Sequence, residues 1–283
     1  MGAVTVFSRV GIIGVGLIGG SVARAARAAN ASVEVLGLDL GDRAEAAAAA
    51  GVIDRAGYVD AIAECDLVVL AAPISANLAW LDRLAAMRTP ALVTDTGGNK
   101  RQMAAKAAAL GDRLRFIGGH PMAGSERSGF AAADAELFRD RKWFLVPQRE
   151  TPAADLDAVF GWIRALGAVP SVTDAETHDR VMAAVSALPQ VTASALMAVV
   201  GERVDLSGLA MSGPGLRDTT RLAGSAATWM TDGLAHNSRE VADAIDALIT
   251  ELRAVRDHLD TPERVSSLFT RAQQWRRALT EPR

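Results

Sequence analysis

A glycine-rich turn near the start of the chain constrains the fold more than any other feature. Residues 14–19 read GVGLIG, a G-x-G-x-x-G pattern that follows an apolar run at 9–15. A second apolar run, at 33–39, ends in Asp39, 20 residues after Gly19. A strand, a glycine turn, a helix and a second strand closed by an acid are together typical of a dinucleotide-binding unit.

Each position of this turn has an expected role toward the nucleotide. Gly14 permits the tight turn, Gly16 lets the backbone approach the pyrophosphate, and Gly19 lets the helix pack closely on the sheet. The pyrophosphate then lies at the positive N-terminus of the helix. Asp39 would accept hydrogen bonds from the ribose hydroxyls and repel a 2′-phosphate, so NAD is favoured over NADP, a preference that Arg43 could soften. The alternative is a glycine turn that binds no nucleotide.

Composition and charge exclude several classes of protein. The chain has 283 residues, a formal net charge of −3, a pI near 5.9 and no basic patch, which argues against nucleic-acid binding. Cys65 is the one cysteine and there are four histidines, so we expect no intrachain disulfide and no metal site. The N-terminus lacks a secretory pattern, and we expect no stretch of about 18 uncharged apolar residues that could span a membrane. These features predict a cytoplasmic protein with no nucleic-acid or membrane partner.

Strand and helix patterns alternate in the first part of the chain and give way to helices after about residue 172. Apolar strand candidates alternate with helical stretches, as in a parallel sheet covered on both faces. The strand candidates lie at residues 9–15, 33–39, 67–72, 91–96, 114–118 and 143–146. Residues 173–176, TDAE, form a capping box that starts a helix. The helical runs that follow lie at 176–201, 203–211, 226–259 and 262–280. The prediction is an α/β fold: a Rossmann-type doubly wound sheet over residues 1–172, followed by an all-helical domain over residues 173–283.

Two further segments carry candidate chemistry. Residues 118–126, GGHPMAGSE, follow a predicted strand, and ligands bind at the carboxyl ends of the strands in such a sheet. His120 would there reach the nicotinamide face and act as a general base or hydrogen-bond a hydroxyl being oxidised; the alternative is a histidine that merely caps a loop. Lys100, just after another strand, could face an anionic ligand or lie on a solvated helix. Arg217 and Arg221, in a glycine-containing segment of the helical domain, suit carboxylate binding if that segment faces the cofactor.

Taken together, these motifs resemble the prephenate and arogenate dehydrogenase family of tyrosine biosynthesis over nearly the whole chain. The matching segments are GVGLIGGS at 14–21, AAP at 71–73, DTGGNK at 95–100, GHPMAGSE at 119–126, the region 173–190 and LRDTTR at 216–221. The glycine motif is common to many dehydrogenases, whereas its combination with GHPMAGSE and LRDTTR is far more specific. The resemblance implies a Rossmann-type domain and a helical domain that forms a homodimer, with NAD as cofactor and a cyclohexadienyl acid as substrate.

The resemblance also implies a reaction and assigns residues to it. The reaction is the oxidative decarboxylation of a cyclohexadienol: hydride passes to NAD, the ring carboxylate leaves as carbon dioxide and the ring becomes aromatic. His120 matches the histidine that bonds the hydroxyl and assists its deprotonation, and Arg221 matches the arginine that holds a substrate carboxylate. The other residues assigned to the substrate are Asp218, which helps position the arginine segment, Arg217, Lys100, Gln190, Ser125 and Glu126. The residues assigned to the cofactor are Gly14, Gly16, Leu17, Ile18, Gly19, Asp39, Ala72, Pro73 and Thr96.

The chain departs from the family pattern at three positions. Gly98 stands where the family carries a serine whose hydroxyl helps the histidine or the substrate, and Ala187 and Gln190 replace two histidines. Neither replacement can carry positive charge. The Gln190 amide could accept from an ammonium and donate to a carboxylate, so we hypothesise that arogenate, with its amino acid side chain, is used at least as well as prephenate, a keto acid. The alternative is that Gln190 only packs near the pocket.

Two other functions are compatible with these departures. One is a dehydrogenase of the same fold that acts on a related cyclohexadienyl substrate, such as an amino-substituted prephenate. The other is an NAD-binding regulator that has lost catalysis, against which the retained His120 and Arg221 argue. His178 and Asp179, just inside the first long helix of the second domain, are expected to serve the structure of the domain junction rather than catalysis.

Overall fold

Eight strands form one sheet in the order β3-β2-β1-β4-β5-β6-β7-β8. The strands are β1 Arg9–Ile13, β2 Glu34–Leu38, β3 Arg55–Ala56, β4 Leu67–Leu70, β5 Leu92–Asp95, β6 Arg115–Pro121, β7 Lys142–Pro147 and β8 Val169–Val172. Strands β1 to β6 pair in parallel in the Rossmann order, which brings their carboxyl ends to one edge of the sheet. The sequence predicted six of these strands and missed the two at the edges of the sheet, β3 and β8.

The last strands depart from the predicted parallel pattern. β7 pairs antiparallel with β6, and β8 pairs parallel with β7. The expectation of a parallel sheet is therefore correct from β1 to β6 and wrong at β7. The reason lies in the connection: the described part of residues 122–141 contains a 3₁₀ turn, η2 (Phe130–Ala132), and no crossover helix.

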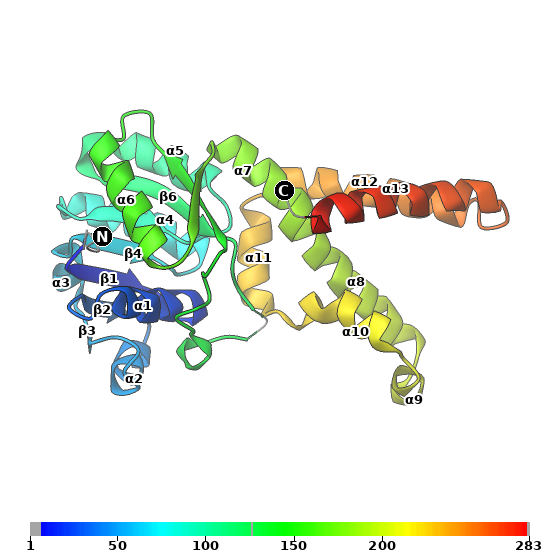
Figure 1. Ribbon diagram of the computed structural model, residues 1–283, viewed down its shortest axis with the longest axis horizontal. Coiled ribbons are helices and arrows are strands. Elements are labelled where there is room, and N and C mark those ends of the chain that lie inside the picture. The colour runs from blue at the N-terminus through cyan, green and yellow to red at the C-terminus, as the bar shows by residue number, and fades with distance from the viewer. Residues whose placement is uncertain (1–6, 126, 282–283) are drawn as a thin grey trace. The chain divides into compact units, whose positions relative to one another are not determined.

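The computed structural model describes residues 7–125 and 127–281. The chain divides into two units, Met1–Ser238 and Arg239–Arg283. The first unit holds the sheet, and helices lie on both of its faces (Figure 1). The helices around the sheet are α1 Leu17–Ala29, α2 Arg43–Ala49, α3 Val59–Ala63, α4 Ile74–Ala86, α5 Arg101–Leu110 with the 3₁₀ turn η1 Gly111–Arg113, and α6 Ala153–Ala165.

Alternation of side chains along the strands gives the sheet two apolar faces. Leu67 and Val69 of β4 belong to one core cluster, with side chains of α1 and α6. Val68 and Leu70 belong to the other cluster, with side chains of α4 and α5. All four are fully buried, as expected for a parallel strand covered on both faces.

The helical part begins one residue away from the predicted capping box. Asp174 is the N-cap of α7, and its carboxylate accepts from the Thr177 N–H at 2.8 Å. The cap is therefore the aspartate, not Thr173 as predicted. The elements that follow are α7 Ala175–Met182, a π-helical turn η3 Ala183–Ala187, α8 Leu188–Arg203, α9 Leu206–Ala210, α10 Pro214–Thr220, a 3₁₀ turn η4 Arg221–Gly224, α11 Ala227–Ala235, α12 Ser238–Arg256 and α13 Pro262–Thr280. The predicted run 226–259 is thus two helices, and α10 was not predicted.

One continuous helical stretch, Ala175–Arg203, is long and apolar enough to cross a membrane by length and composition alone. Residues 181–201 contain no Asp, Glu, Lys or Arg, so the expectation that no such stretch exists is wrong. Only 17% of its apolar window is buried within this chain. The helix therefore presents apolar side chains that the described residues leave uncovered, among them Val185 and Val199.

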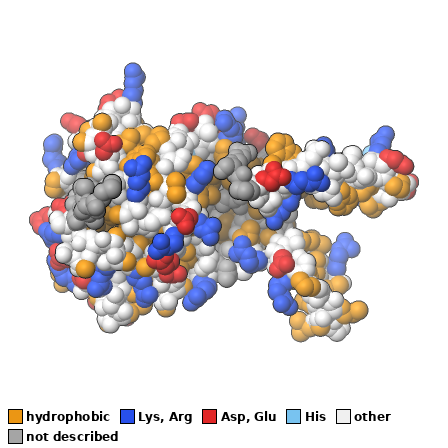
Figure 2. Space-filling view, viewed as in Figure 1, with side chains coloured by type: hydrophobic (Ala, Val, Ile, Leu, Met, Phe, Trp, Pro, Cys, Tyr) orange, Lys and Arg blue, Asp and Glu red, His pale blue; other side chains and the backbone are white. Residues whose placement is uncertain are grey.

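Exposed apolar side chains also gather near α9 and in the second unit. Leu206 is the first residue of α9 and Met211 follows its last, and Phe269, Trp275 and Leu279 lie on α13. Each is more than 60% exposed. Figure 2 shows hydrophobic side chains along these helices. Such surfaces are typical of protein–protein contacts.

Candidate active site

The glycine turn between β1 and α1 has the geometry that a dinucleotide requires. Gly14 adopts a φ of 96°, and a Cβ there would lie 2.6 Å from the backbone carbon of Ala71. A Cβ on Gly19 would lie 2.0 Å from the carbonyl oxygen of Gly14. Around Gly16, by contrast, a Cβ would meet nothing within 4 Å. The turn therefore closes tightly at its ends and leaves open space at the N-terminus of α1, where a pyrophosphate would bind.

Asp39 lies where β2 ends and fixes this turn. Its Oδ2 accepts from the Val15 N–H at 2.7 Å, and its Oδ1 accepts from the Leu40 N–H at 2.6 Å. Arg43 lies 3.9 Å from Oδ1 and is mostly exposed. A carboxylate has about four acceptor positions, so Asp39 retains acceptors for ribose hydroxyls. The residues at this edge thus fit a dinucleotide.

The remaining residues assigned to the cofactor lie at the same edge of the sheet. Leu17 and Ile18 open α1. Ala72 and Pro73 follow β4, and Pro73 is the N-cap of α4. Thr96 follows β5, and its N–H donates to the last carbonyl of β4 at 3.0 Å. Contact of these residues with the cofactor stays a prediction.

His120 lies on β6 and hydrogen-bonds a second histidine. His120 Nδ1 is 2.9 Å from Nε2 of His178 on α7, and the two rings meet edge to face. The other nitrogen of His178, Nδ1, is 2.8 Å from Oδ1 of Asp179. Asp179 accepts from the backbone N–H groups of Lys100 and Arg101 at 2.7 and 2.9 Å. One chain of hydrogen bonds therefore joins β6, α7 and the start of α5.

The surroundings of these hydrogen-bonded residues set the charge of His120 and of Asp179. Burial, followed by the charges of His178 and Lys100, holds the pKa of His120 well below its usual range. Burial alone would raise the pKa of Asp179, but hydrogen bonds from His178 and from two backbone N–H groups outweigh it and lower the pKa. The site therefore pairs a neutral imidazole on β6 with an ionised carboxylate on α7.

Lys100 is fully buried beside these hydrogen-bonded residues. This burial excludes the alternative that Lys100 lies on the solvated face of a helix. Its ammonium pairs with the carboxylate of Asp95. Burial lowers the pKa of Lys100, and Asp95 opposes that shift. Asp95 also accepts from the N–H groups of Gly97 and Gly119, both at 2.9 Å, and so joins the end of β5 to the strand that carries His120. The assignment of Lys100 to the substrate stays a prediction.

Gly98, the position of the missing serine, faces His120. A Cβ added there would lie 3.8 Å from His120 Nε2. This is the ring nitrogen that does not bond His178. The glycine at position 98 therefore leaves His120 Nε2 without the neighbouring hydroxyl that the family serine would supply.

Gln190 holds the turn that begins with Arg221. Its Nε2 donates to the Leu222 carbonyl at 2.7 Å, and its Oε1 accepts from the Ser225 hydroxyl at 3.3 Å. Both ends of the buried amide thus bond η4 or the residue after it. These bonds favour the alternative in which Gln190 packs near the site and supports the arginine segment.

The other residues assigned to the substrate lie on exposed parts of the chain. Arg217 and Asp218 are exposed on α10, and Arg221 is exposed on η4. Ser125 is exposed, and its hydroxyl accepts from the Arg127 N–H at 3.1 Å. Glu126 lies outside the described residues. Their roles toward a substrate stay predictions.

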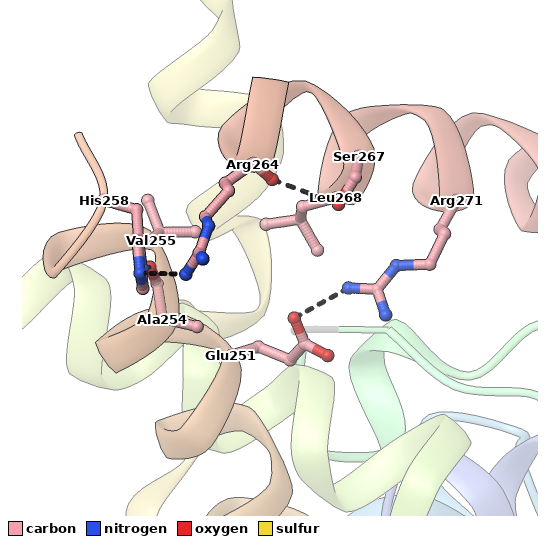
Figure 3. Close-up of a pocket in the computed structure, with 8 residues that line it drawn as sticks. All are labelled: Glu251, Ala254, Val255, His258, Arg264, Ser267, Leu268 and Arg271. Carbon is pink, nitrogen blue, oxygen red and sulfur yellow. Dashed lines mark hydrogen bonds and ion pairs between the residues drawn. The ribbon is translucent and has the colours of Figure 1, made fainter. Parts of the chain in front are cut away.

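A groove of about 230 Å³ lies elsewhere, between α12 and α13 (Figure 3). It is lined by Glu251, Ala254, Val255, His258, Arg264, Ser267, Leu268 and Arg271. Its charged walls bond each other: Arg271 pairs with Glu251 at 2.9 Å, and Arg264 bonds His258. It contains none of the residues assigned to cofactor or substrate. Within residues 7–125 and 127–281, no group of three or more His, Cys, Asp or Glu side chains is placed to hold a metal ion.

Comparison with known families accounts for both parts of the chain. Residues 22–172 match the nucleotide-binding domain of prephenate dehydrogenase, and residues 174–273 match the dimerization domain of prephenate dehydrogenase. The chain belongs to the prephenate dehydrogenase family. The two matches meet at residues 172–174, whereas the compact units divide after Ser238, so the domain boundary at 172 stays a prediction.

Relatives and a solved structure of prephenate dehydrogenases resemble the chain over most of its length. Prephenate dehydrogenase of Bacillus subtilis is 32% identical over 266 residues, which cover 91% of this chain and 71% of the relative. Cyclohexadienyl dehydrogenase of Zymomonas mobilis is 32% identical over 270 residues, which cover 89% of this chain and 88% of the relative. The crystal structure of prephenate dehydrogenase from Aquifex aeolicus, in complex with hydroxyphenyl propionate and NAD+, has a TM-score of 0.87 and 27% identity. It covers 96% of this chain and 98% of that one.

Membership of the prephenate dehydrogenase family confirms the predicted cofactor and class of enzyme. The chain is an NAD-dependent oxidoreductase of aromatic amino acid biosynthesis. Its helical part matches the family's dimerization domain over residues 174–273, which include the apolar helix α8 and the exposed Phe269 of α13. The predicted homodimer through the helical part is therefore confirmed.

Sequence reasoning did not predict the contact between His178 and His120. His178 and Asp179 were expected to serve the domain junction, yet His178 hydrogen-bonds His120 directly. The signal available in the sequence was their place in the first turns of a capped helix directly after the last strand. That place indicates the edge of the sheet but does not reveal which strand the helix contacts.

Proposed function

We propose that this enzyme catalyses the NAD-dependent oxidative decarboxylation of a cyclohexadienol that bears a ring carboxylate, namely arogenate, prephenate or both. The observation that carries the proposal is His120, an imidazole kept neutral at the carboxyl edge of the sheet, with Nδ1 bonded to His178 and Nε2 facing Gly98. A neutral nitrogen at the end of a strand, along the edge that carries the glycine turn, is suited to take a hydroxyl proton.

The proposed roles follow the flow of protons and charge. His120 Nε2 takes the proton of the ring hydroxyl. NAD, when bound, supplies the acceptor for the hydride on the carbon that bears this hydroxyl. The ring carboxylate leaves as carbon dioxide, and its bonding electrons complete the aromatic ring. Because aromatisation and loss of carbon dioxide drive the reaction, the protein mainly has to orient the acid and remove one proton.

Binding of the anionic substrate falls to the arginine segment in this proposal. Arg221 binds a substrate carboxylate through its planar guanidinium group, with help from Arg217. Gln190 supports this role because its bonds to Leu222 and Ser225 hold the turn that begins with Arg221. Lys100 contributes as a buried charge near His120, because its ammonium already pairs with Asp95.

The side chain of the substrate is the finer part of the proposal. Positions 187 and 190 carry Ala and Gln, so neither offers an imidazolium to a keto acid. We therefore propose that arogenate is used at least as well as prephenate. Initial rates of NADH formation with each acid test this; a large preference for prephenate in kcat/KM would contradict it. We also place the enzyme in the cytoplasm, in keeping with a single buried cysteine that can form no intrachain disulfide.

A further inference from the structure

The direction of each hydrogen bond behind His120 can be assigned atom by atom. An ionised carboxylate only accepts, and Asp179 already accepts from two backbone N–H groups, at 2.7 and 2.9 Å. His178 Nδ1, 2.8 Å from Asp179 Oδ1, must therefore carry the proton of that bond. In neutral His178 this leaves Nε2 as an acceptor, so His120 Nδ1, 2.9 Å away, must donate to it. Nε2 of His120 is then unprotonated.

The surroundings keep this arrangement in place. His178 is 2% exposed, and the ring of Phe144 on β7 meets it edge to face at 6.0 Å between centroids. The Asn237 amide donates to the Asp179 carbonyl at 2.8 Å. On the other side of His120, Gly98 provides no side chain toward Nε2. The position of the His120 imidazole is thus set by its bond to His178, on the side away from Gly98.

We infer that His178 and Asp179 are positioning residues that hold His120 in its Nδ1–H tautomer, so that Nε2 is the nitrogen that takes the substrate proton. This inference rests on the proposed function and goes beyond it, because it assigns the tautomer and the two residues that impose it. The titratable and charged groups that face His120 are His178 and Asp179 from α7, and Lys100 with its partner Asp95 from the β5–α5 segment.

Four variants separate positioning from ordinary junction structure. His178→Leu removes the acceptor for His120. His178→Gln retains it, because Oε1 can accept from His120 while the amide nitrogen donates to Asp179. Asp179→Asn replaces one of two accepting oxygens by a donor and so favours the wrong tautomer of His178. His236→Gln is the matched control, since His236 also joins two elements, by a bond to Gln102, and is not part of the hydrogen bonds that link His120, His178 and Asp179.

The kinetic outcome divides between kcat and KM. We expect kcat to fall roughly 10²-fold in His178→Leu and Asp179→Asn, with KM and the Kd for NAD within about threefold of the wild type. His178→Gln should retain kcat within about fivefold, and His236→Gln should retain it fully. Equal losses in His178→Leu and His178→Gln, or a kcat in folded His178→Leu within about threefold of the wild type, would overturn the inference.

A second measurement does not depend on turnover. The chain has four histidines, so long-range ¹H–¹⁵N NMR of protein labelled at histidine can assign the tautomer of each. We expect His120 and His178 both as Nδ1–H tautomers in the wild type, and a changed tautomer at His120 in Asp179→Asn. An Nε2–H tautomer of His120 in the wild type would overturn the inference. Failure of the wild type to oxidise either acid would instead refute the proposed function and leave the tautomer result standing.

Discussion

At the residue scale, the ionisation of His120 decides the pH range of turnover. The neutral imidazole is the active form, and burial together with the charges of His178 and Lys100 lowers its pKa. Activity should therefore persist as pH falls through the usual histidine pKa of about 6.5, and decline only at lower pH, where His120 takes up a proton. The kcat/KM profile measures this directly. An acidic limb centred above the usual value would show that the active base is not a histidine with a lowered pKa.

Asp39 carries a second prediction at this scale, on the choice of cofactor. In the wild type the Val15 N–H donates to Asp39 Oδ2 at 2.7 Å. In Asp39→Asn the amide oxygen can still accept this bond, but the charge that would repel a 2′-phosphate is gone. We expect the ratio of kcat/KM for NADP over NAD to rise about tenfold, which corresponds to about 1.4 kcal/mol. Arg43→Ala is the control, because it leaves the carboxylate in place and should not raise this ratio. An unchanged ratio in Asp39→Asn would remove Asp39 from the ribose site.

At the element scale, Gln190 joins α8 to η4, and its loss should be felt through the arginine segment. Gln190→Leu leaves the Leu222 carbonyl without its 2.7 Å donor, and we expect the free energy of unfolding to fall by about 1–3 kcal/mol. KM for the acid should rise more than kcat falls, because η4 begins with Arg221. Thr192→Ala is a matched control on the same helix, since the Thr192 hydroxyl donates within α8, to the Leu188 carbonyl. Calorimetry measures the free energy of unfolding, and initial rates measure KM and kcat. Equal effects of Gln190→Leu and Thr192→Ala would contradict the role of Gln190.

The elements also show how far sequence reasoning reaches. The turn from Gly14 to Asp39 was predictable because strand, turn and acid are close in the sequence and follow one local geometry. His120 was found because it comes just after the predicted strand at 114–118; in the structure it lies near the end of β6. Its bond to His178 spans 58 residues, and no local pattern reveals that α7 meets β6. The direction of β7 was missed for a similar reason: the residues of an apolar strand do not indicate whether it pairs parallel or antiparallel with its neighbour.

At the scale of the whole molecule, the exposed apolar side chains of α13 predict where association can be broken. Trp275 is 77% exposed in the single chain. Trp275→Glu should place a charge in the contact between copies and shift the protein from dimer to monomer in light scattering. Gln274→Glu adds a negative charge at the neighbouring exposed position and should leave the dimer intact. Dimers that persist unchanged in Trp275→Glu would place the contact on another surface, such as that of α8.

The measurement that tests the central claim most directly follows NADH and carbon dioxide together, with purified protein, NAD and either arogenate or prephenate. The account predicts equal amounts of both products from at least one acid. It also predicts that His120→Asn still binds NAD but loses roughly 10²- to 10⁴-fold in kcat. NAD binding without oxidation of either acid, or undiminished turnover in His120→Asn, would contradict the account.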